Sequence, residues 1–299
     1  MNFIVLFYAS AENRFYNNKK QTNTMNKLFK FLAALFAASS IAFAGLGVSG
    51  FVDASWGDDD SEIAIDEVEL RLTLDSEGTV SGAADVSYTP ANGTGGDTVD
   101  LEQVYLTYDL GNGASLKIGQ FESSLGFDAF DADGLIANSA MLDFGLANNG
   151  YDQGIRYSSG ALNVSLVEEG GEVSGDAYSL EVSYGLNLGE GLNAFVGMRT
   201  DDASGNDLTN AYVTYETGAL TLIAETYEGE GANEGTQIAA VYSYSDSSAI
   251  TLRSAEEDGV DSTTIAHATQ LADDLALIID VTDVDGADSN TVVELLYTF

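Results

Sequence analysis

The chain has 299 residues and a formal net charge of −38, with one Pro, no Cys and abundant Gly and Tyr. Without Cys there is no disulfide framework and no thiolate chemistry. Five of the ten cations precede residue 45, whereas 47 of the 48 acids follow it, so the chain after residue 44 carries a formal charge of −42. This balance excludes nucleic acid as a partner, because binding it needs clustered Lys and Arg.

The N-terminal part has the layout of a targeting segment. From Met25 a basic stretch, Met-Asn-Lys-Leu-Phe-Lys, precedes an apolar run that ends in Ala42-Phe-Ala44. This order is typical of a secretory signal peptide, and the run is shorter than the roughly 20 residues that span a bilayer. We therefore predict a signal peptide over residues 25–44. Residues 1–24 have a mixed composition and are interpreted as an upstream mis-start without a structural role.

Residues 45–299 are predicted to form one all-β domain. Apolar and polar residues alternate with period 2 throughout, and no window shows a helical period over a helix length. The alternation predicts sixteen strands, at residues 46–56, 62–74, 79–89, 98–110, 114–121, 151–158, 161–168, 177–186, 191–200, 208–216, 219–228, 235–245, 248–255, 262–271, 274–283 and 290–299.

The connections between these strands alternate in length. Tight turns such as 111–113 and 159–160 carry the Gly, Asn and Ser of hairpins, and longer Asp- and Gly-rich links such as 169–176, 201–207 and 256–261 fall between them. An even number of strands with short turns at one end and longer loops at the other is typical of a transmembrane up-and-down antiparallel β-barrel. We predict such a barrel, with about 16 strands.

The two faces of the predicted strands differ in polarity. Val68, Leu70 and Leu72 share one face, and Glu67 and Glu69 lie on the other. In a membrane barrel the apolar face meets lipid and the polar face lines a wet lumen. Tyrosines near strand ends on the apolar face predict an aromatic girdle: Tyr88, Tyr108, Tyr157, Tyr184, Tyr215, Tyr244 and Tyr297.

The segment 122–150 is the one long stretch that does not alternate like a strand. It mixes apolar residues with acids and is too apolar for a floppy tail, and long connections in compact β domains are usually functional or disordered. We predict a loop folded back into the lumen, where it narrows the pore. The acids of this loop are the candidate constriction residues: Glu122, Asp128, Asp131, Asp133 and Asp143.

The cations of the mature chain are predicted to point into the lumen, because Lys or Arg at the centre of the lipid face would cost about 2–4 kcal/mol each. These residues are Arg71, Lys117, Arg156, Arg199 and Arg253. Two interpretations remain open. They form either a cationic wall opposite the acidic loop, with a transverse field at the constriction, or ordinary salt bridges that hold the barrel round. In both cases the excess of acids predicts a preference for cations.

Three motifs that carry chemistry elsewhere are weak here. Residues 45–50 match G-x-G-x-x-G but follow the predicted signal peptide rather than a strand. Asp131-Ala-Asp-Gly134 and Asp283-Val-Asp-Gly286 lack the spacing and distal Glu of an EF-hand, although their oxygens allow adventitious Ca²⁺ or Mg²⁺. His267 is the only histidine and has no arranged Ser or Asp partner, which disfavours a hydrolase.

The stretch from Leu101 to Gly160 carries a family resemblance, and the rest of the chain shares only the architecture. Leu101-Glu-Gln-Val-Tyr-Leu-Thr-Tyr, Leu116-Lys-Ile-Gly-Gln-Phe121 and the stretch from Leu125 to Asp133 resemble Gram-negative outer-membrane porins, in particular the β-barrel porin and phosphate-selective porin-like families. The resemblance implies a trimeric 16-stranded channel whose long third extracellular loop folds into the pore. Phosphate selectivity does not carry over, because those relatives use a Lys- or Arg-rich pore.

The C-terminal strand also resembles outer-membrane barrels. It alternates and ends in Phe299, like the signature that their assembly machinery recognises. The sequence thus predicts a non-enzymatic, cation-preferring porin in the outer membrane of a Gram-negative bacterium, which passes small hydrophilic solutes and needs no cofactor or metal. Its expected partners are outer-membrane lipid, lipopolysaccharide, the barrel assembly machinery and two further copies in a homotrimer. The alternative is a non-conducting structural or adhesive barrel plugged by residues 122–150.

Overall fold

The computed structural model describes residues 45–57, 63–75, 78–90, 97–127, 132–134, 136–137, 150–168, 178–200, 207–229 and 234–299. The predicted signal peptide and residues 1–24 lie outside these ranges. Within them the chain forms one short 3-10 helix, η1 (Ala132–Gly134), and sixteen strands: β1 Leu46–Gly57, β2 Ile63–Asp75, β3 Val80–Thr89, β4 Thr98–Gly111, β5 Ala114–Glu122, β6 Tyr151–Ser159, β7 Leu162–Glu168, β8 Tyr178–Gly189, β9 Leu192–Thr200, β10 Leu208–Thr217, β11 Leu220–Gly229, β12 Glu234–Ser245, β13 Ser248–Glu257, β14 Val260–Ala272, β15 Leu275–Val284 and β16 Asn290–Thr298.

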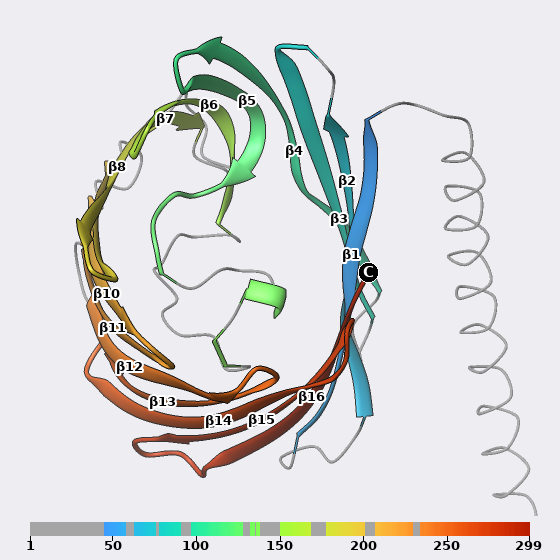
Figure 1. Ribbon diagram of the computed structural model, residues 1–299, viewed down its shortest axis with the longest axis vertical. Helices are drawn as coiled ribbons and strands as arrows, with labels where there is room; N and C mark the ends of the chain where they lie inside the picture. Colours follow the sequence, from blue (N-terminus) through green and yellow to red (C-terminus); the bar gives the residue numbers. More distant parts are fainter. Residues whose placement is uncertain are drawn as a thin grey trace, which may run out of the picture. The chain divides into compact units, whose positions relative to one another are not determined.

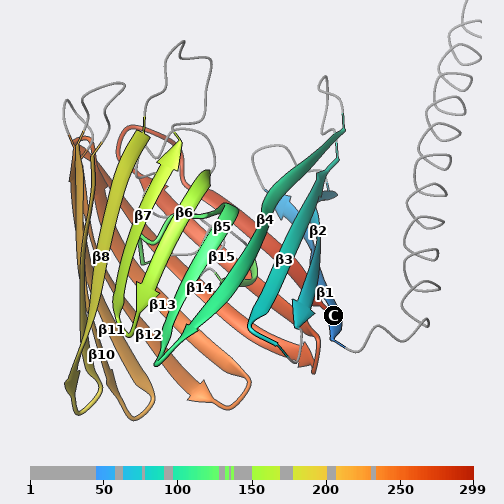
Figure 2. The same cartoon turned by 90° about the horizontal axis from the view of Figure 1, so that it is seen from above.

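The strands form a closed antiparallel barrel, as the sequence predicts. Each strand pairs with its neighbours in chain order, and the ring closes where β1 meets β16 (Figures 1 and 2). The C-terminal residue takes part in this closure, because Phe299 and Gly50 exchange two backbone hydrogen bonds of 3.0 and 3.1 Å. Among the described residues, no helix is long and apolar enough to cross a membrane.

The barrel is polar inside and apolar outside, which is the reverse of a soluble core. On β12, Gln237 and Ala239 are buried inside, whereas Ile238 between them is 64% exposed. The buried polar residues include Glu69, Asp85, Glu181, Glu225, Asp280 and Glu294, all on the face that the sequence predicts as inward. The outer face exposes Leu, Ile, Val and Tyr, including six of the seven predicted girdle tyrosines; Tyr88 is half-buried.

One predicted long link is wrong. The segment 256–261 was expected to be a longer loop, but β13 runs to Glu257 and β14 begins at Val260, so only Asp258 and Gly259 turn the chain. Both have positive φ, 50° and 80°. Asp-Gly is the pair that favours two positive φ values in a row, and this tight geometry matches the twist of the flanking strands. The regular alternation of short and long connections is therefore broken here.

Candidate functional site: the barrel interior

The residues that follow β5 run along the inner wall. We call residues 123–127 the inner segment; in Figure 1 it appears as the green trace inside the ring of strands, together with η1. The segment contacts the wall at successive strands, and farther on Thr251 of β13 donates a 3.0 Å hydrogen bond from Oγ1 to the carbonyl oxygen of Ile136. The described parts of the 122–150 connection thus lie against strands on several sides of the interior.

Glu181 of β8 holds the start of the inner segment. Its carboxylate accepts hydrogen bonds from Ser123 Oγ at 2.6 Å, and from the backbone N and Oγ of Ser124 at 2.9 and 2.7 Å. The same carboxylate pairs with Arg156 Nη2 of β6 at 3.1 Å, and that nitrogen also donates to the carbonyl oxygen of Glu122 at 2.7 Å. Glu181 is 1% exposed. Charge-assisted hydrogen bonds to a buried carboxylate are strong, so this network fixes the path of the chain as it leaves β5.

A second buried glutamate holds the end of the inner segment. Glu225 of β11 accepts a 2.9 Å bond from the backbone N of Phe127, a 2.9 Å bond from Asn210 Nδ2 and a 2.6 Å bond from Gln237 Nε2. Asn210 of β10 in turn accepts from the backbone N of Gly126 at 3.1 Å. The backbone N–H groups of Ser124, Gly126 and Phe127 therefore all donate to inward side chains of the wall.

Apolar contacts fill the space between these two polar anchors. Leu125 packs in a buried cluster with four wall residues, Phe195, Leu208, Tyr227 and Ala255. A Cβ on Gly197 would lie 2.3 Å from Leu125 Cδ2, so a larger residue there would force the Leu125 side chain to shift. Aromatic stacking continues the cluster: Phe127 meets Tyr212 edge-on at 5.5 Å, and Tyr212 stacks on Phe195 at 4.6 Å between ring centroids.

The predicted acids of the constriction are only partly described. Glu122 is the last residue of β5, and Asp133 lies in η1, which packs against β16. Asp128, Asp131 and Asp143 lie outside the described residues. The structure therefore places two of the five acids. The transverse field between the cations of the wall and the acids of the loop stays a prediction.

The predicted cations line the inner face, and three of them pair with acids of the wall. Arg156 pairs with Glu181 as above. Arg71 lies 3.2 Å from Glu69 and 3.1 Å from Asp85, and Arg199 lies 2.6 Å from Asp152. These pairs have the geometry expected of ordinary salt bridges between strands of the wall, the second of the two interpretations of the cations. Arg253 is 5% exposed, and its Nη2 donates to Thr264 at 3.4 Å.

Lys117 differs from the arginines. It lies directly across from Arg156 in the register of β5 and β6, and no ion pair links it to any described carboxylate. Its ammonium sits 4.0 Å from the ring centroid of Tyr105 and 5.7 Å from that of Phe121. Aromatic faces attract a cation without neutralising it, so Lys117 keeps a net positive charge toward the interior.

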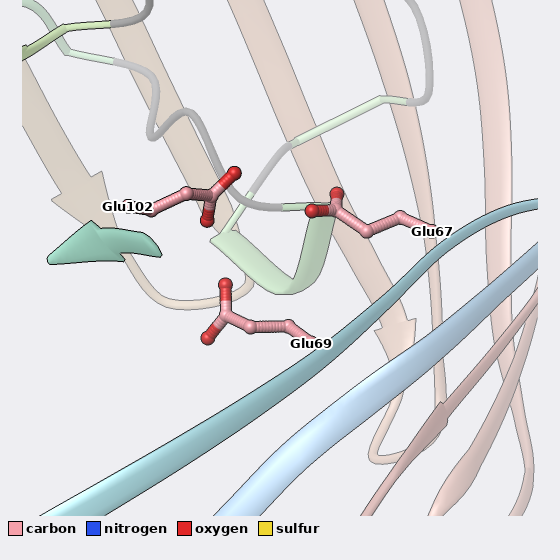
Figure 3. A group of neighbouring side chains, drawn as sticks. All are labelled: Glu67, Glu69 and Glu102. Carbon is pink, nitrogen blue, oxygen red and sulfur yellow. The ribbon is translucent and has the colours of Figure 1, made fainter. Parts of the chain in front are cut away.

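Carboxylates gather on the neighbouring part of the inner wall, on β2 and β4. Glu67 and Glu69 of β2 and Glu102 of β4 point toward one another (Figure 3), with one oxygen of each within 4.8 Å of the others. Glu102 reaches this group because β4 carries a β-bulge: Asp85 of β3 pairs with Gln103, and Val86 pairs with Leu101. The unpaired residue of a bulge re-aims its side chain.

His267 does not face the interior. It alternates with the buried Ala266 on β14 and meets Tyr244 of β12 on the outer face, where Tyr244 Oη and His267 Nε2 are 2.6 Å apart. The two rings stack with centroids 5.9 Å apart. The histidine that a hydrolase would need thus belongs to the aromatic belt of the outer surface.

Sequence reasoning missed the residues that hold the inner segment. Alternation by itself puts Glu181, Glu225 and Gly197 on the polar face, but it does not indicate a role for them, because their partners are about 57 to 98 positions away in sequence. Glu102 was missed for a different reason, since strict alternation puts it on the face opposite Gln103. A single extra polar residue inside a strand does not show in the sequence that the strand has a bulge there.

Comparisons with known proteins support the fold. No family model matches the chain, and no curated protein matches its sequence. Among solved structures, a mutant of Rh. blastica porin superposes with a TM-score of 0.65 at 14% identity, covering 85% of this chain and 100% of that one. A Rhodopseudomonas blastica porin triple mutant and a structure described as concerning asymmetric conductivity of engineered proteins each give a TM-score of 0.64 with the same identity and coverage. The chain has the porin fold.

Proposed function

We propose that the protein is a passive porin of the outer membrane of a Gram-negative bacterium. The observation that carries this proposal is the inverted polarity of a closed barrel, with carboxylates, arginines and amides inside and exposed Leu, Ile and Tyr outside. A transmembrane barrel needs this arrangement, because its outer band faces lipid. Closure of the sheet gives the backbone N–H and C=O groups of all strands hydrogen-bond partners. A non-enzymatic channel also agrees with the position of its single histidine on the outer face.

The mechanism is diffusion of small hydrophilic solutes and ions through water in the lumen. The inner segment narrows the lumen on the side of β8 to β11, where it is held by Glu181 and Glu225. We propose that the constriction combines Glu122, Asp128, Asp131, Asp133 and Asp143 with the wall cations Arg71, Lys117, Arg156 and Arg199. Because acids outnumber cations on the inner wall, we expect cations to permeate better than anions.

The membrane partners follow from the outer face. Exposed tyrosines near the tight-turn end would sit at the lipid headgroups, and lipopolysaccharide would face the other end. The terminal Phe299, paired with Gly50 at the seam of the barrel, would be the signal read by the barrel assembly machinery. We expect that function requires no cofactor, although the Asp oxygens of residues 131–134 and 283–286 could bind Ca²⁺ or Mg²⁺ adventitiously.

We further propose a homotrimer. The outer faces of β1 and β3 carry small residues, Gly50 and Ala54 on one strand and Gly82 and Ala84 on the other, and none of these is strongly exposed. Small residues let membrane helices pack closely, and we expect these Gly and Ala positions, which lie on either side of the larger outward residues of β2, to lie in the contact between subunits. Chemical cross-linking in native membranes should give a ladder that ends at three subunits.

Liposome swelling tests the proposed function. Vesicles containing the folded chain should swell in isotonic solutions of small sugars, at a rate that falls steeply with the size of the sugar. Correct folding is checked by the heat-modifiable migration of the barrel on gels. If vesicles with correctly folded barrels do not swell in any of the sugars, the porin proposal is overturned in favour of a plugged structural barrel.

A further inference from the structure

We propose that the outer face of β11 to β14 holds a site for one phospholipid with an amine headgroup, phosphatidylethanolamine. Two features lie next to each other on this face: a polar patch at the tight-turn end, and an apolar groove nearer the middle of the strands. The first matches a phosphate headgroup, and the second matches an acyl chain. The inference rests on the proposed membrane location of the barrel, but not on whether solutes pass through its lumen.

The polar patch consists of Tyr244, Ser248, His267 and Thr269, which share the outward face of β12, β13 and β14. Tyr244 Oη and His267 Nε2 are 2.6 Å apart, and Ser248 Oγ and Thr269 Oγ1 are 2.7 Å apart. Ser248 is directly opposite Thr269 in the register of β13 and β14, and His267 lies two positions before Thr269 on the same face of β14. The two hydrogen-bonded pairs therefore form one continuous patch.

Each pair of the patch keeps one hydrogen-bond donor that the protein does not use. A phenol and a neutral imidazole carry one O–H and one N–H, and the single bond between Tyr244 and His267 uses one of these hydrogens, whichever atom donates it. Ser248 and Thr269 likewise carry two hydroxyl hydrogens and share one bond. Among the described residues, these four side chains make no other hydrogen bond. A donor that faces lipid without an acceptor is costly, so the patch calls for an acceptor from the membrane.

The apolar groove adjoins the patch on the same face of the barrel. Ala240 of β12 lies opposite Leu222 of β11 and Leu252 of β13, so one short outward side chain stands between two long ones. Ile265 of β14 also lines the groove, whose volume is about 570 Å³. This volume lies within the range of about 300–1,000 Å³ that is typical of ligand pockets. Because Ile265 precedes His267 by two positions on the outward face, a chain in the groove would lead directly to the patch.

The neighbouring turns favour an amine headgroup over an anionic one. Asp246 lies in the turn between β12 and β13, and Asp273 and Asp274 form the turn between β14 and β15. The first turn adjoins the end of β14, because the backbone N of Gln270 donates to the carbonyl oxygen of Ser247 at 2.8 Å. The three acids are exposed, and none pairs with a cation of the described residues. They attract the ammonium of a lipid whose phosphate accepts from the patch, and they repel a headgroup with net negative charge.

Native mass spectrometry of the full chain tests the site, because it counts and identifies bound lipids. The folded barrel, freed of lipid in detergent, would be titrated with phosphatidylethanolamine, with phosphatidylglycerol of the same acyl chains, and with lipopolysaccharide. We expect one saturable site for phosphatidylethanolamine. Phosphatidylglycerol should bind there about two- to fivefold more weakly, since exposed ion pairs contribute modestly, and lipopolysaccharide should not displace the bound lipid.

Two variants probe the two halves of the site. Tyr244→Phe/His267→Leu removes both possible donors of one pair and should weaken phosphatidylethanolamine binding at least about tenfold, the effect of one lost hydrogen bond to a charged group. Ala240→Phe fills the groove and should also weaken binding at least about tenfold. Tyr157→Phe/Tyr184→Phe is the control, because it removes two hydroxyls from exposed tyrosines of β6 and β8. It should bind like the wild type.

Any of four results would overturn the proposal: no saturable binding of phosphatidylethanolamine, equal binding of phosphatidylglycerol, displacement by lipopolysaccharide, or unchanged affinity in either variant. Should the double variant not fold, Ala240→Phe decides alone, because it only adds apolar atoms to the outer face. A barrel that conducts but binds no phosphatidylethanolamine would contradict only the lipid site. A barrel that binds the lipid but never conducts would contradict only the porin proposal.

Discussion

Replacing Glu181 by Gln should release the inner segment from the wall. The carboxylate accepts three hydrogen bonds from Ser123 and Ser124 and pairs with Arg156, whose side chain is only 10% exposed. The amide of Gln keeps the shape but removes the charge, so Arg156 is left buried without its anion. Breaking a buried ion pair from one side costs about 3–5 kcal/mol, and we expect a loss of stability toward that size.

The assay has two readouts. Urea unfolding of the folded barrel in lipid vesicles, followed by the fluorescence of the single tryptophan, Trp56, gives the free energy of unfolding. Single-channel recording gives the conductance and its noise, which should both rise when the segment is loosened. The Glu228→Gln variant is the matched control, because it removes the same charge from an exposed site. A Glu181→Gln barrel with unchanged stability and an unchanged, quiet conductance would refute the reasoning.

Three further substitutions probe other parts of the account. Gly197→Val should destabilise the barrel by about 1–3 kcal/mol, because its Cβ would overlap Leu125. Gly185→Val is the control and should not destabilise it, because the nearest atom lies 3.9 Å from a Cβ there. Equal effects of the two substitutions would contradict the close contact between Gly197 and Leu125. Ile238→Lys should cost about 2–4 kcal/mol in lipid vesicles, and a negligible cost would argue against a lipid-facing β12. Lys117→Met should raise the cation-to-anion permeability ratio about sixfold, because one charge about 8 Å away in water changes the energies of a cation and an anion by about 0.5 kcal/mol each, in opposite directions. Lys117→Arg should keep the ratio, and no change in Lys117→Met would place Lys117 away from the ion path.

The fold could be predicted from the sequence because a barrel wall is a repetitive local pattern. Alternation fixes which residues share a face, and most strand ends agree with the structure within a few residues. The exception at 256–261 shows the limit, because a link that is rich in Asp and Gly looks long even when Asp258 and Gly259 alone make the turn. Composition does not reveal how many residues the twist of the strands requires.

The interior could be predicted only as a set of inward residues. Period 2 places Glu181, Glu225 and Gly197 inside, but the bonds to the inner segment join positions far apart in the chain and depend on the closed barrel. The bulge at Glu102 reverses the face that alternation assigns. Local patterns therefore give the lining of the lumen, and the tertiary structure decides which of its residues act together.

The central claim is that water and ions pass through the lumen beside the fixed inner segment. Single-channel conductance of the folded chain in a planar bilayer under a KCl gradient tests it most directly. The account predicts discrete steps that occur in groups of three, with a reversal potential on the side of K⁺. A correctly folded barrel that gives no steps would contradict the claim, and an anion-selective reversal potential would contradict the proposed acidic constriction.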